Sequence, residues 1–420
     1  MAHILFERLL PVLNGIPEYA EQEPATQGCE DVEVFSLFLA TAMDLITAYL
    51  FGLSNSTNFI DQETYRRDWQ EMYLARANYP FWTQEVPTLT SFCKQWFPWL
   101  RLYPKWVDES NSKLSDWNWS LCDKTNKARI NNGVSTNQEG VDHVDESVVY
   151  NALHAGIDRE FRVNGERSIL YNTSILHRDR AIASELMDHS LAGQETAGIA
   201  LTYATWHVSK SPSLQEQLRA EILTLEPSLK VDDLRQRVRG REVTENISGS
   251  PILPDPKAVD SLPLLHAVVM ETLRLYAPIP GPQPRQTPKE GCYIGEHYIP
   301  GNVRIAALAY TLHRDTEVFP RPEQWKPGRW LKQASSGDKK RELRQDEVQL
   351  REINKRFWAF GSGGRMCVGS NFAMNEMKFI LAAIYANFQT TVVDDGGIEQ
   401  EDAYTARPVG ERLVIRFHKL

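Results

Sequence analysis

The chain has 420 residues, 42% of them hydrophobic, a composition that allows one or two globular domains and excludes a disordered protein. Its formal net charge of −9 excludes an overall basic surface, so we expect no nucleic-acid partner. The five cysteines are odd in number and include no Cys-x-x-Cys pair, which favours a reducing compartment over a disulfide or zinc framework.

Apolar residues at helical spacing dominate the chain, so we predict a mainly α fold with a small β component. Predicted helices cover residues 4–14, 34–51, 62–77, 88–97, 108–123, 146–156, 180–208, 212–225, 264–276 and 371–388. Predicted strands cover 292–294, 303–307 and 413–417. Polar connections are expected at 123–145, 230–262 and 333–356, the last with charges that also suit a solvated helix. No connection resembles a domain linker, so residues 1–420 are predicted to form a single domain.

The helix predicted over residues 34–51 is almost continuously apolar and about as long as a membrane span. Asp44 lies in its middle, and an unpaired carboxylate is costly in lipid. We therefore interpret the segment as a buried helix of a soluble core. Residues 1–13 are too short and too charged for a secretory signal or an anchor.

Residues 191–198, with the sequence Leu-Ala-Gly-Gln-Glu-Thr-Ala-Gly, interrupt a long predicted helix with small residues. Glycine weakens a helix interior, so its presence calls for a packing or functional reason. One interpretation is close helix packing. The other is a ligand space beside a paired acid and hydroxyl, Glu195 and Thr196.

Glu271 and Arg274 are three residues apart on a predicted helix, so they share one face and can form a charge-assisted pair. Such pairs are usually solvated. The rest of this helix is apolar, however, so the pair is predicted to be buried and to need further partners. Arg329, in Trp-Lys-Pro-Gly-Arg-Trp at 325–330, is the candidate for a third charge.

Residues 360–369, Phe-Gly-Ser-Gly-Gly-Arg-Met-Cys-Val-Gly, form a glycine-rich segment that leads into the last predicted helix. The glycines permit a tight loop that directs backbone N–H groups at one sulfur, that of Cys367. The positive end of the following helix also stabilises a thiolate. The pattern indicates a metal-binding thiolate; the alternative is a buried structural cysteine after a turn.

These motifs, in this order and spacing, resemble those of the cytochrome P450 family, most closely its fungal members. The resemblance implies the P450 fold and a haem b cofactor, iron protoporphyrin IX, with the Cys367 thiolate as axial ligand. It implies proton delivery by Glu195 and Thr196. It also implies that Glu271, Arg274 and Arg329 lock the fold beneath the ligand loop. The other positions implied to contact the haem are Phe360, Gly363, Arg365, Gly369, Arg285, Ala192 and Gly193.

The roles of these positions follow from the same resemblance. Arg365 and Arg285 are placed to pair with the haem propionates, because guanidinium groups suit carboxylates. Ala192 and Gly193 leave room above the iron for oxygen and substrate. Ala197 stands where many members carry a second hydroxyl residue, so the proton relay differs in detail.

The resemblance implies a monooxygenase that inserts one atom of O2 into a lipophilic organic substrate, in fungal secondary metabolism or on a hydrophobic xenobiotic. NADPH is expected to supply electrons through NADPH-cytochrome P450 reductase, and cytochrome b5 is a further possible partner. Full-length relatives of this type lie on the cytosolic face of the endoplasmic reticulum membrane.

Ordinary members begin with an anchor, strands and early helices that include a Trp-x-x-x-Arg motif. Because these parts are missing, an N-terminally truncated form is expected, cytosolic or peripherally attached.

Three other functions stay open at this point. Some P450 relatives isomerise or dehydrate oxygenated substrates without a reductase, although Glu195 and Thr196 favour oxygenation. A non-catalytic or haem-binding remnant is suggested by the missing N-terminal part. A cysteine hydrolase using Cys367 would need a histidine base, and the spacing singles out none.

Overall fold

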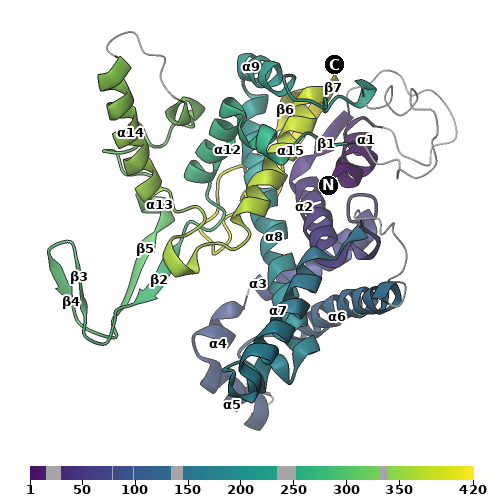
Figure 1. The fold of residues 1–420 in the computed structure, drawn as a ribbon, viewed down its shortest axis with the longest axis vertical. Helices are drawn as coiled ribbons and strands as arrows, with labels where there is room; N and C mark the ends of the chain where they lie inside the picture. The colour runs from purple at the N-terminus through teal and green to yellow at the C-terminus, as the bar shows by residue number, and fades with distance from the viewer. Residues whose placement is uncertain (16–29, 78, 98, 134–144, 234–251, 332–338) are drawn as a thin grey trace. The chain divides into compact units, whose positions relative to one another are not determined.

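The computed structural model describes residues 1–15, 30–77, 79–97, 99–133, 145–233, 252–331 and 339–420. These residues divide into two compact units, one formed by Met1–Ala42 with Glu195–Leu420 and the other by Met43–Gln194. Two long helices, α2 (Val34–Phe51) and α8 (Arg178–Ser209), contribute residues to both units (Figure 1).

The larger unit holds most of the β structure and the C-terminal helices. Its helical segments are η1 (Ile4–Leu9), α1 (Leu10–Leu13), α9 (Pro212–Ile222), α11 (Pro256–Asp260), α12 (Pro263–Leu275), α13 (Ala309–Leu312), η6 (Pro327–Trp330), α14 (Lys339–Arg356), η7 (Gly363–Arg365) and α15 (Ser370–Asn387). Its strands are β1 (Glu30–Glu33), β2 (Pro282–Gln286), β3 (Cys292–Ile294), β4 (His297–Ile299), β5 (Arg304–Leu308), β6 (Phe388–Asp394) and β7 (Val414–Lys419). They form a three-stranded sheet in the order β1-β7-β6 and the pairs β2-β5 and β3-β4, all antiparallel.

The described residues of the smaller unit form helices joined by turns and loops, without a strand. Its segments are η2 (Leu53–Asn55), α3 (Glu63–Ala77), α4 (Pro80–Gln84), α5 (Pro87–Trp96), α6 (Lys105–Gly133), α7 (Val148–Asn164), η4 (Gly165–Arg167) and η5 (Tyr171–Ile175). Helices α3 and α6 pack together through Trp69 and Trp117, whose ring centroids are 5.4 Å apart.

Helix α2 is long and apolar enough to span a membrane, yet 83% of it is buried in the structure. The Asp44 carboxylate, which is fully buried, accepts hydrogen bonds from the Thr57 hydroxyl and the Phe59 N–H, both at 2.7 Å. This pairing compensates the loss of water around the charge. The predicted interpretation of α2 as a buried core helix agrees with these contacts.

Helix α9 connects two other helices of the larger unit through charged side chains. The Glu221 carboxylate accepts hydrogen bonds from the backbone N–H groups of Leu264 and Leu265, at 2.7 and 2.9 Å, at the start of α12. Arg219 donates to the carbonyls of Tyr385 and Phe388, at 3.1 and 2.9 Å, at the end of α15. Both contacts satisfy backbone groups that a helix end leaves unpaired. They hold α12 and α15, the helices that flank the candidate site in sequence.

The predicted mainly α fold with a small β component is confirmed, and the predicted helices are all present, α2 with the predicted bounds and the others with shifted ends. The connection predicted at 123–145 is wrong up to Gly133, because α6 continues there. Thr125 explains part of the extension, since its buried hydroxyl bonds to the carbonyls of Leu121 and Phe51.

Strands β1, β2, β4 and β6 were not predicted. Residues 134–144, 234–251 and 332–338 of the predicted connections lie outside the described residues. Helix α14 occupies most of the third connection.

Candidate haem-binding site

The Cys367 loop is a tight turn that leaves the thiol exposed. Gly361 and Gly363 have φ angles of 72° and 68°, in the left-handed region that only glycine adopts without strain. The Cys367 N–H donates to the Phe360 carbonyl at 2.8 Å, which closes the loop. Helix α15 begins at Ser370, after Gly369, so the thiol lies at the N-terminal side of a long helix. The loop therefore presents a sulfur atom outward with a helix N-terminus beside it.

Strand β2 braces the loop from another part of the chain. Arg285 donates from Nη2 to the Ser362 carbonyl at 2.8 Å, and Gln283 donates from Nε2 to the Trp358 carbonyl at 3.2 Å. Arg285 was predicted near the haem from its sequence position, whereas Gln283 was not singled out. The prolines on both sides of Gln283 hid strand β2 from the sequence analysis, since proline is uncommon in paired strands.

Arg365 and Phe360 occupy different environments around the sulfur. Phe360 is half-buried, and Arg365 is exposed. Within the described part of the chain, the Arg365 side chain makes no hydrogen bond or ion pair. A free guanidinium two residues before the thiol suits a carboxylate ligand such as a propionate.

Glu271 is the centre of a buried charge network on α12. Arg274 makes a bidentate contact with its carboxylate, at 2.8 and 2.9 Å, and both side chains are fully buried. The carboxylate also accepts from Arg329 Nε at 3.0 Å, Trp330 Nε1 at 3.0 Å and the Lys326 N–H at 2.8 Å. The structure thus brings the three predicted charges together, with two additional donors. Five hydrogen bonds offset the desolvation of one carboxylate.

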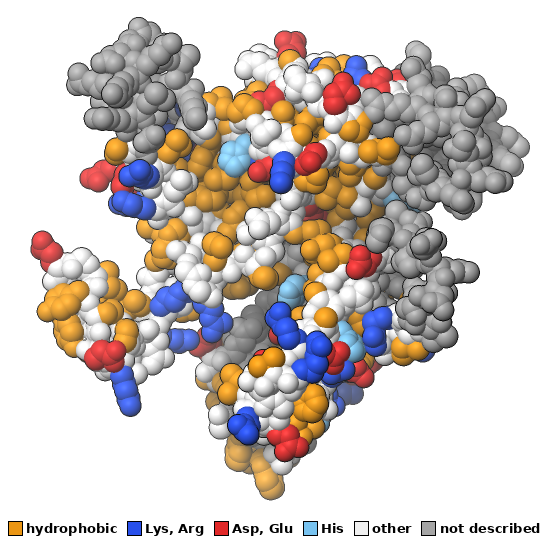
Figure 2. Space-filling view, viewed as in Figure 1, with side chains coloured by type: hydrophobic (Ala, Val, Ile, Leu, Met, Phe, Trp, Pro, Cys, Tyr) orange, Lys and Arg blue, Asp and Glu red, His pale blue; other side chains and the backbone are white. Residues whose placement is uncertain are grey.

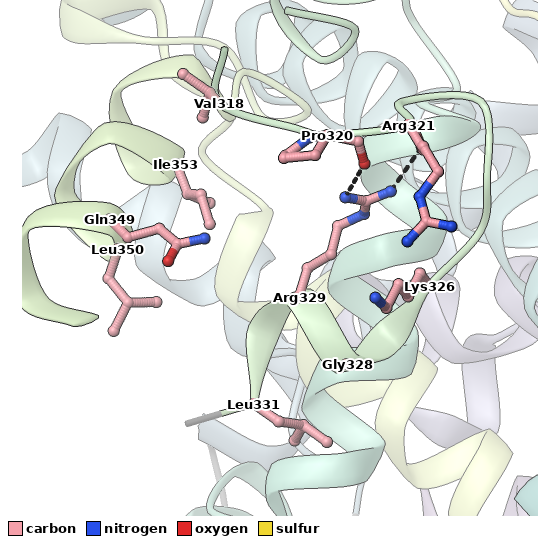
Figure 3. Close-up of a pocket in the computed structure, with 10 residues that line it drawn as sticks. All are labelled: Val318, Pro320, Arg321, Lys326, Gly328, Arg329, Leu331, Gln349, Leu350 and Ile353. Carbon is pink, nitrogen blue, oxygen red and sulfur yellow. Dashed lines mark hydrogen bonds between the residues drawn. The ribbon is translucent and has the colours of Figure 1, made fainter. Parts of the chain in front are cut away.

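Arg329 also fixes the chain that follows Phe319. Figure 3 shows its guanidinium pointing to the carbonyls of Pro320 and Arg321, at 2.6 and 2.7 Å, on one wall of a small cavity of about 180 Å³. Arg321 has a φ of 53°, which is unusual for a side-chain-bearing residue. One arginine therefore joins the Glu271 carboxylate to a turn with a strained backbone.

Glu195, the predicted proton donor, is buried and pairs with the C-terminal turn. Its carboxylate accepts from Arg407 Nε at 2.7 Å and from the Thr405 hydroxyl at 2.9 Å. Arg407 also contacts Glu411 at 2.6 Å. Burial alone would lower the pKa of Arg407, but the carboxylates of Glu195 and Glu411 outweigh it and the pKa is raised. Thr405 and Arg407 lie more than 200 positions from Glu195, in the turn of residues 404–408 that the family resemblance implies to border the substrate pocket. The sequence did not single out either residue as a partner of Glu195.

The glycines among residues 191–198 of α8 lie where a larger side chain would collide with a neighbour. A Cβ added to Gly193 would lie 2.7 Å from Ile46 Cγ1, and one added to Gly198 would lie 2.7 Å from Leu39 Cδ2. Both glycines thus permit close helix packing, the first of the two interpretations of residues 191–198. Ala192 is exposed and Thr196 half-buried. The role of Ala192 and Gly193 in leaving space above an iron stays a prediction.

These residues fit a haem. The exposed Cys367 thiol provides one soft ligand, and Met366 and Val368 beside it are apolar and 58% and 85% exposed, which suits cover by a porphyrin. Crowding does not require a glycine at position 369, because a Cβ there would lie 3.9 Å from the Cys367 sulfur, an ordinary contact distance.

A cysteine loop braced by β2, together with a buried Glu-Arg-Arg network, is the arrangement expected of a haem-thiolate protein. Residues 21–409 match the family model described as Cytochrome P450. The chain belongs to the cytochrome P450 family, whose cofactor is iron protoporphyrin IX held by a cysteine thiolate. The matched range includes residues of both compact units.

Curated fungal proteins are similar to part of this chain. It is 32% identical over 240 residues to "Cytochrome P450 monooxygenase tazI" of Aspergillus terreus, an alignment covering 56% of this chain and 41% of the relative. Against "Cytochrome P450 monooxygenase FGM1" of Gibberella zeae the identity is 30% over 242 residues, covering 57% and 41%. For "Cytochrome P450 monooxygenase hkm5" of Aspergillus hancockii it is 27% over 261 residues, covering 60% and 44%. The chain thus matches about two fifths of the length of these relatives.

Proposed function

We propose that this chain forms the haem-binding part of a fungal P450 monooxygenase, within a single P450 domain, that inserts one atom of O2 into a lipophilic substrate of secondary metabolism. The observation that carries the proposal is the exposed Cys367 thiol at the end of a glycine loop braced by β2. The names of the similar fungal proteins support the reaction class. A haem bound at Cys367 would supply the oxygen activation.

The chain's own residues have separate tasks in this proposal. Cys367 would hold the haem iron through its thiolate, and Phe360 would limit the access of water to the sulfur. Arg365 and Arg285 would hold the propionates by charge-assisted hydrogen bonds. The Glu195 carboxylate would relay protons together with the hydroxyl of the next residue, Thr196.

The redox partner in this proposal is NADPH-cytochrome P450 reductase, with cytochrome b5 as a second electron donor. The family's need for external electrons supports it, because the glycine loop lacks the spacing of a dinucleotide site: Met366 stands where the third glycine of Gly-x-Gly-x-x-Gly would be. These flavin or haem partners are proposed to dock on the proximal face near Cys367, on the side of the loop that a bound haem would leave uncovered.

Haem loading of the full chain tests the proposal. The chain is loaded with ferric protoporphyrin IX, reduced and exposed to carbon monoxide, and a thiolate-type Soret band is expected. Cys367→Ser should lose that band and keep its far-UV circular dichroism. Cys292→Ser is the matched control, since Cys292 is a half-buried free thiol in β3, and it should keep the band.

Two outcomes would count against the proposal. Absence of haem uptake would favour a non-catalytic remnant, and a thiolate band in Cys367→Ser would assign the ligand elsewhere. NADPH consumption coupled to substrate oxidation with added reductase then separates oxygenation from isomerisation or dehydration, which need no reductase.

We also propose that the protein associates with the cytosolic face of the endoplasmic reticulum membrane through α5. Leu89, Phe92 and Trp96 form an apolar stripe at i, i+3 and i+7 spacing, and each is at least half exposed. Trp99 follows with 79% of its surface exposed. Apolar side chains gather over α4 and α5 in Figure 2. Tryptophan is favoured at the membrane–water interface because its ring is apolar and its N–H polar.

Flotation with phosphatidylcholine vesicles tests this surface. The double variant Trp96→Ser/Trp99→Ser should lose most of the vesicle-bound fraction. The control Ile169→Ser removes a side chain that is 94% exposed outside the stripe and should bind like the parent. Equal loss in both variants would contradict a specific membrane face.

A further inference from the structure

His313, at the end of α13, joins the helix of the buried charge network to the start of the Cys367 loop. Its ring is fully buried and stacks on Phe357 with centroids 5.4 Å apart and planes 17° from parallel. The Nε2 atom accepts a hydrogen bond from the Trp358 backbone N–H at 2.8 Å. The Nδ1 atom lies 2.8 Å from the Arg274 carbonyl oxygen. Both ring nitrogens therefore have a backbone partner.

The partners determine the protonation state of this ring. A backbone N–H can only donate and a carbonyl can only accept, so His313 is neutral with its hydrogen on Nδ1. Burial is the main cause that lowers the pKa of His313; the Arg274 carbonyl opposes it, the charges of Arg274 and Arg314 reinforce it, and together these effects bring the pKa to about 3. The neutral ring is thus kept at physiological pH, and Nε2 retains the lone pair that Trp358 requires.

Each end of this bridge lies within the site. The Trp358 carbonyl accepts from the Gly361 N–H at 3.0 Å and from Gln283 Nε2 at 3.2 Å, so Trp358 anchors the turn that leads to Cys367. At the other end, Arg274 donates from Nη1 to the His313 carbonyl at 2.8 Å, and the same guanidinium holds Glu271. Arg274 is therefore bonded to His313 through both its backbone and its side chain.

We propose that His313 is a positioning residue that sets the place of the Cys367 loop relative to α12, through its two ring hydrogen bonds. The bridge transmits the rigidity of the Glu271 network to the loop, because each of its members is a short hydrogen bond and its centre, His313, is fully buried. Only the identification of the loop as haem-binding rests on the proposed function. The bridge itself is a property of the chain without haem.

Amide hydrogen exchange of the full haem-free chain, resolved at Trp358, tests the bridge. His313→Phe keeps a stacked ring and removes both hydrogen bonds, so exchange at Trp358 should accelerate about tenfold or more. His313→Gln retains a donor and an acceptor and should recover part of the protection. His207→Phe is the matched control: His207 is a half-buried histidine stacked on Trp325 with ring centroids 4.5 Å apart, and desolvation lowers its pKa to about 3 as well. It makes no hydrogen bond to the loop among the described contacts, so Trp358 exchange should be unchanged.

Haem loading provides the second measurement. In His313→Phe the thiolate fraction of the reduced carbon monoxide spectrum should fall, while His207→Phe keeps the parental fraction. Unchanged Trp358 exchange in His313→Phe, or equal acceleration in His207→Phe, would overturn the proposal.

If His313→Phe does not fold, the exchange rate of the Trp358 amide in the parent protein becomes the deciding measurement. A Trp358 amide that exchanges as fast as that of exposed Gly364 shows that no such bond exists, and a protected amide that His313→Gln partly exposes supports it. Failure of haem uptake would contradict the proposed function, whereas the exchange result for the bridge would remain valid.

Discussion

Glu271 on α12 and Glu376 on α15 are both fully buried carboxyl groups in the larger unit, and their surroundings are opposite. Glu271 accepts five hydrogen bonds, three of them from Arg274 and Arg329. Neither oxygen of Glu376 has a hydrogen-bond partner among the described residues, and burial raises its pKa well above the ordinary value of 4.5. Burial is equal, so the two sites differ in their partners: two guanidinium groups contact Glu271, whereas burial without donors favours the neutral acid at Glu376.

The comparison teaches how the site obtains its rigidity. Removing one partner of a buried ion pair strongly destabilises the folded protein, because the other charge is left uncompensated in a low dielectric. A buried neutral acid restrains nothing in that way. The loop of Cys367 is therefore braced from the Glu271 side, through Arg274 and His313.

The largest effect is expected from Glu271→Gln. The amide keeps the shape but removes the charge between Arg274 and Arg329, so the free energy of unfolding should fall by about 3–5 kcal/mol. Urea unfolding at pH 7 measures it. Glu323→Gln, which removes the exposed carboxylate that pairs with half-buried Arg314, is the control and should cost less than about 1 kcal/mol. Equal losses would contradict the role of burial.

Arg407→Gln should remove the charged partner of the buried Glu195 carboxylate and leave the Thr405 hydroxyl as a donor. We expect the free energy of unfolding to fall by about 2–4 kcal/mol at neutral pH. Urea unfolding at pH 7 measures the loss. Glu411→Gln removes only the more exposed partner of Arg407 and should change little. Equal losses in the two variants would contradict a specific role for the contact between Arg407 and Glu195.

Glu376→Gln should make the protein more stable than the parent, and the difference in the free energy of unfolding should grow as the pH rises. The folded pKa of Glu376 lies above the unfolded value of 4.5, so the stability that the neutral acid confers is complete below 4.5. It falls as the pH rises from there through the raised value. The variant lacks this loss, so it should exceed the parent by about 1–2 kcal/mol at pH 8 and equal it at pH 4. Parallel stability–pH curves for the two proteins would show that Glu376 does not titrate in this way.

The smallest effect is expected from Asp31→Asn. Asp31 pairs with Arg416 at 2.6 Å across β1 and β7, and this hydrogen bond lowers the pKa of Asp31. A lowered pKa would make the contribution vanish as the pH falls, but both side chains are exposed and solvent screens the pair. We expect no change beyond the error of urea unfolding at pH 7, and a clear loss would show that this strand pair is more sensitive than an exposed one should be.

Much of the fold was predictable because its signals are local. The bounds of α2 and β3 agree with the prediction to the residue, since each is set by a continuous pattern of side chains. Strand β2 was not predictable from Pro282 and Pro284, and it exists because β5 pairs with it some 20 positions later. For the site, the Cys367 loop and the Glu271–Arg274 pair are short motifs that can be located from spacing.

The amino-acid sequence by itself determined which residues carry charge, thiol and backbone freedom around Cys367, because these properties belong to each residue type and its nearest neighbours. Only the tertiary structure decided that His313 bridges Arg274 and Trp358, at separations of 39 and 45 positions, and that Arg407 meets Glu195. Such pairings depend on which helices and turns pack together, and burial then converts proximity into fixed protonation states.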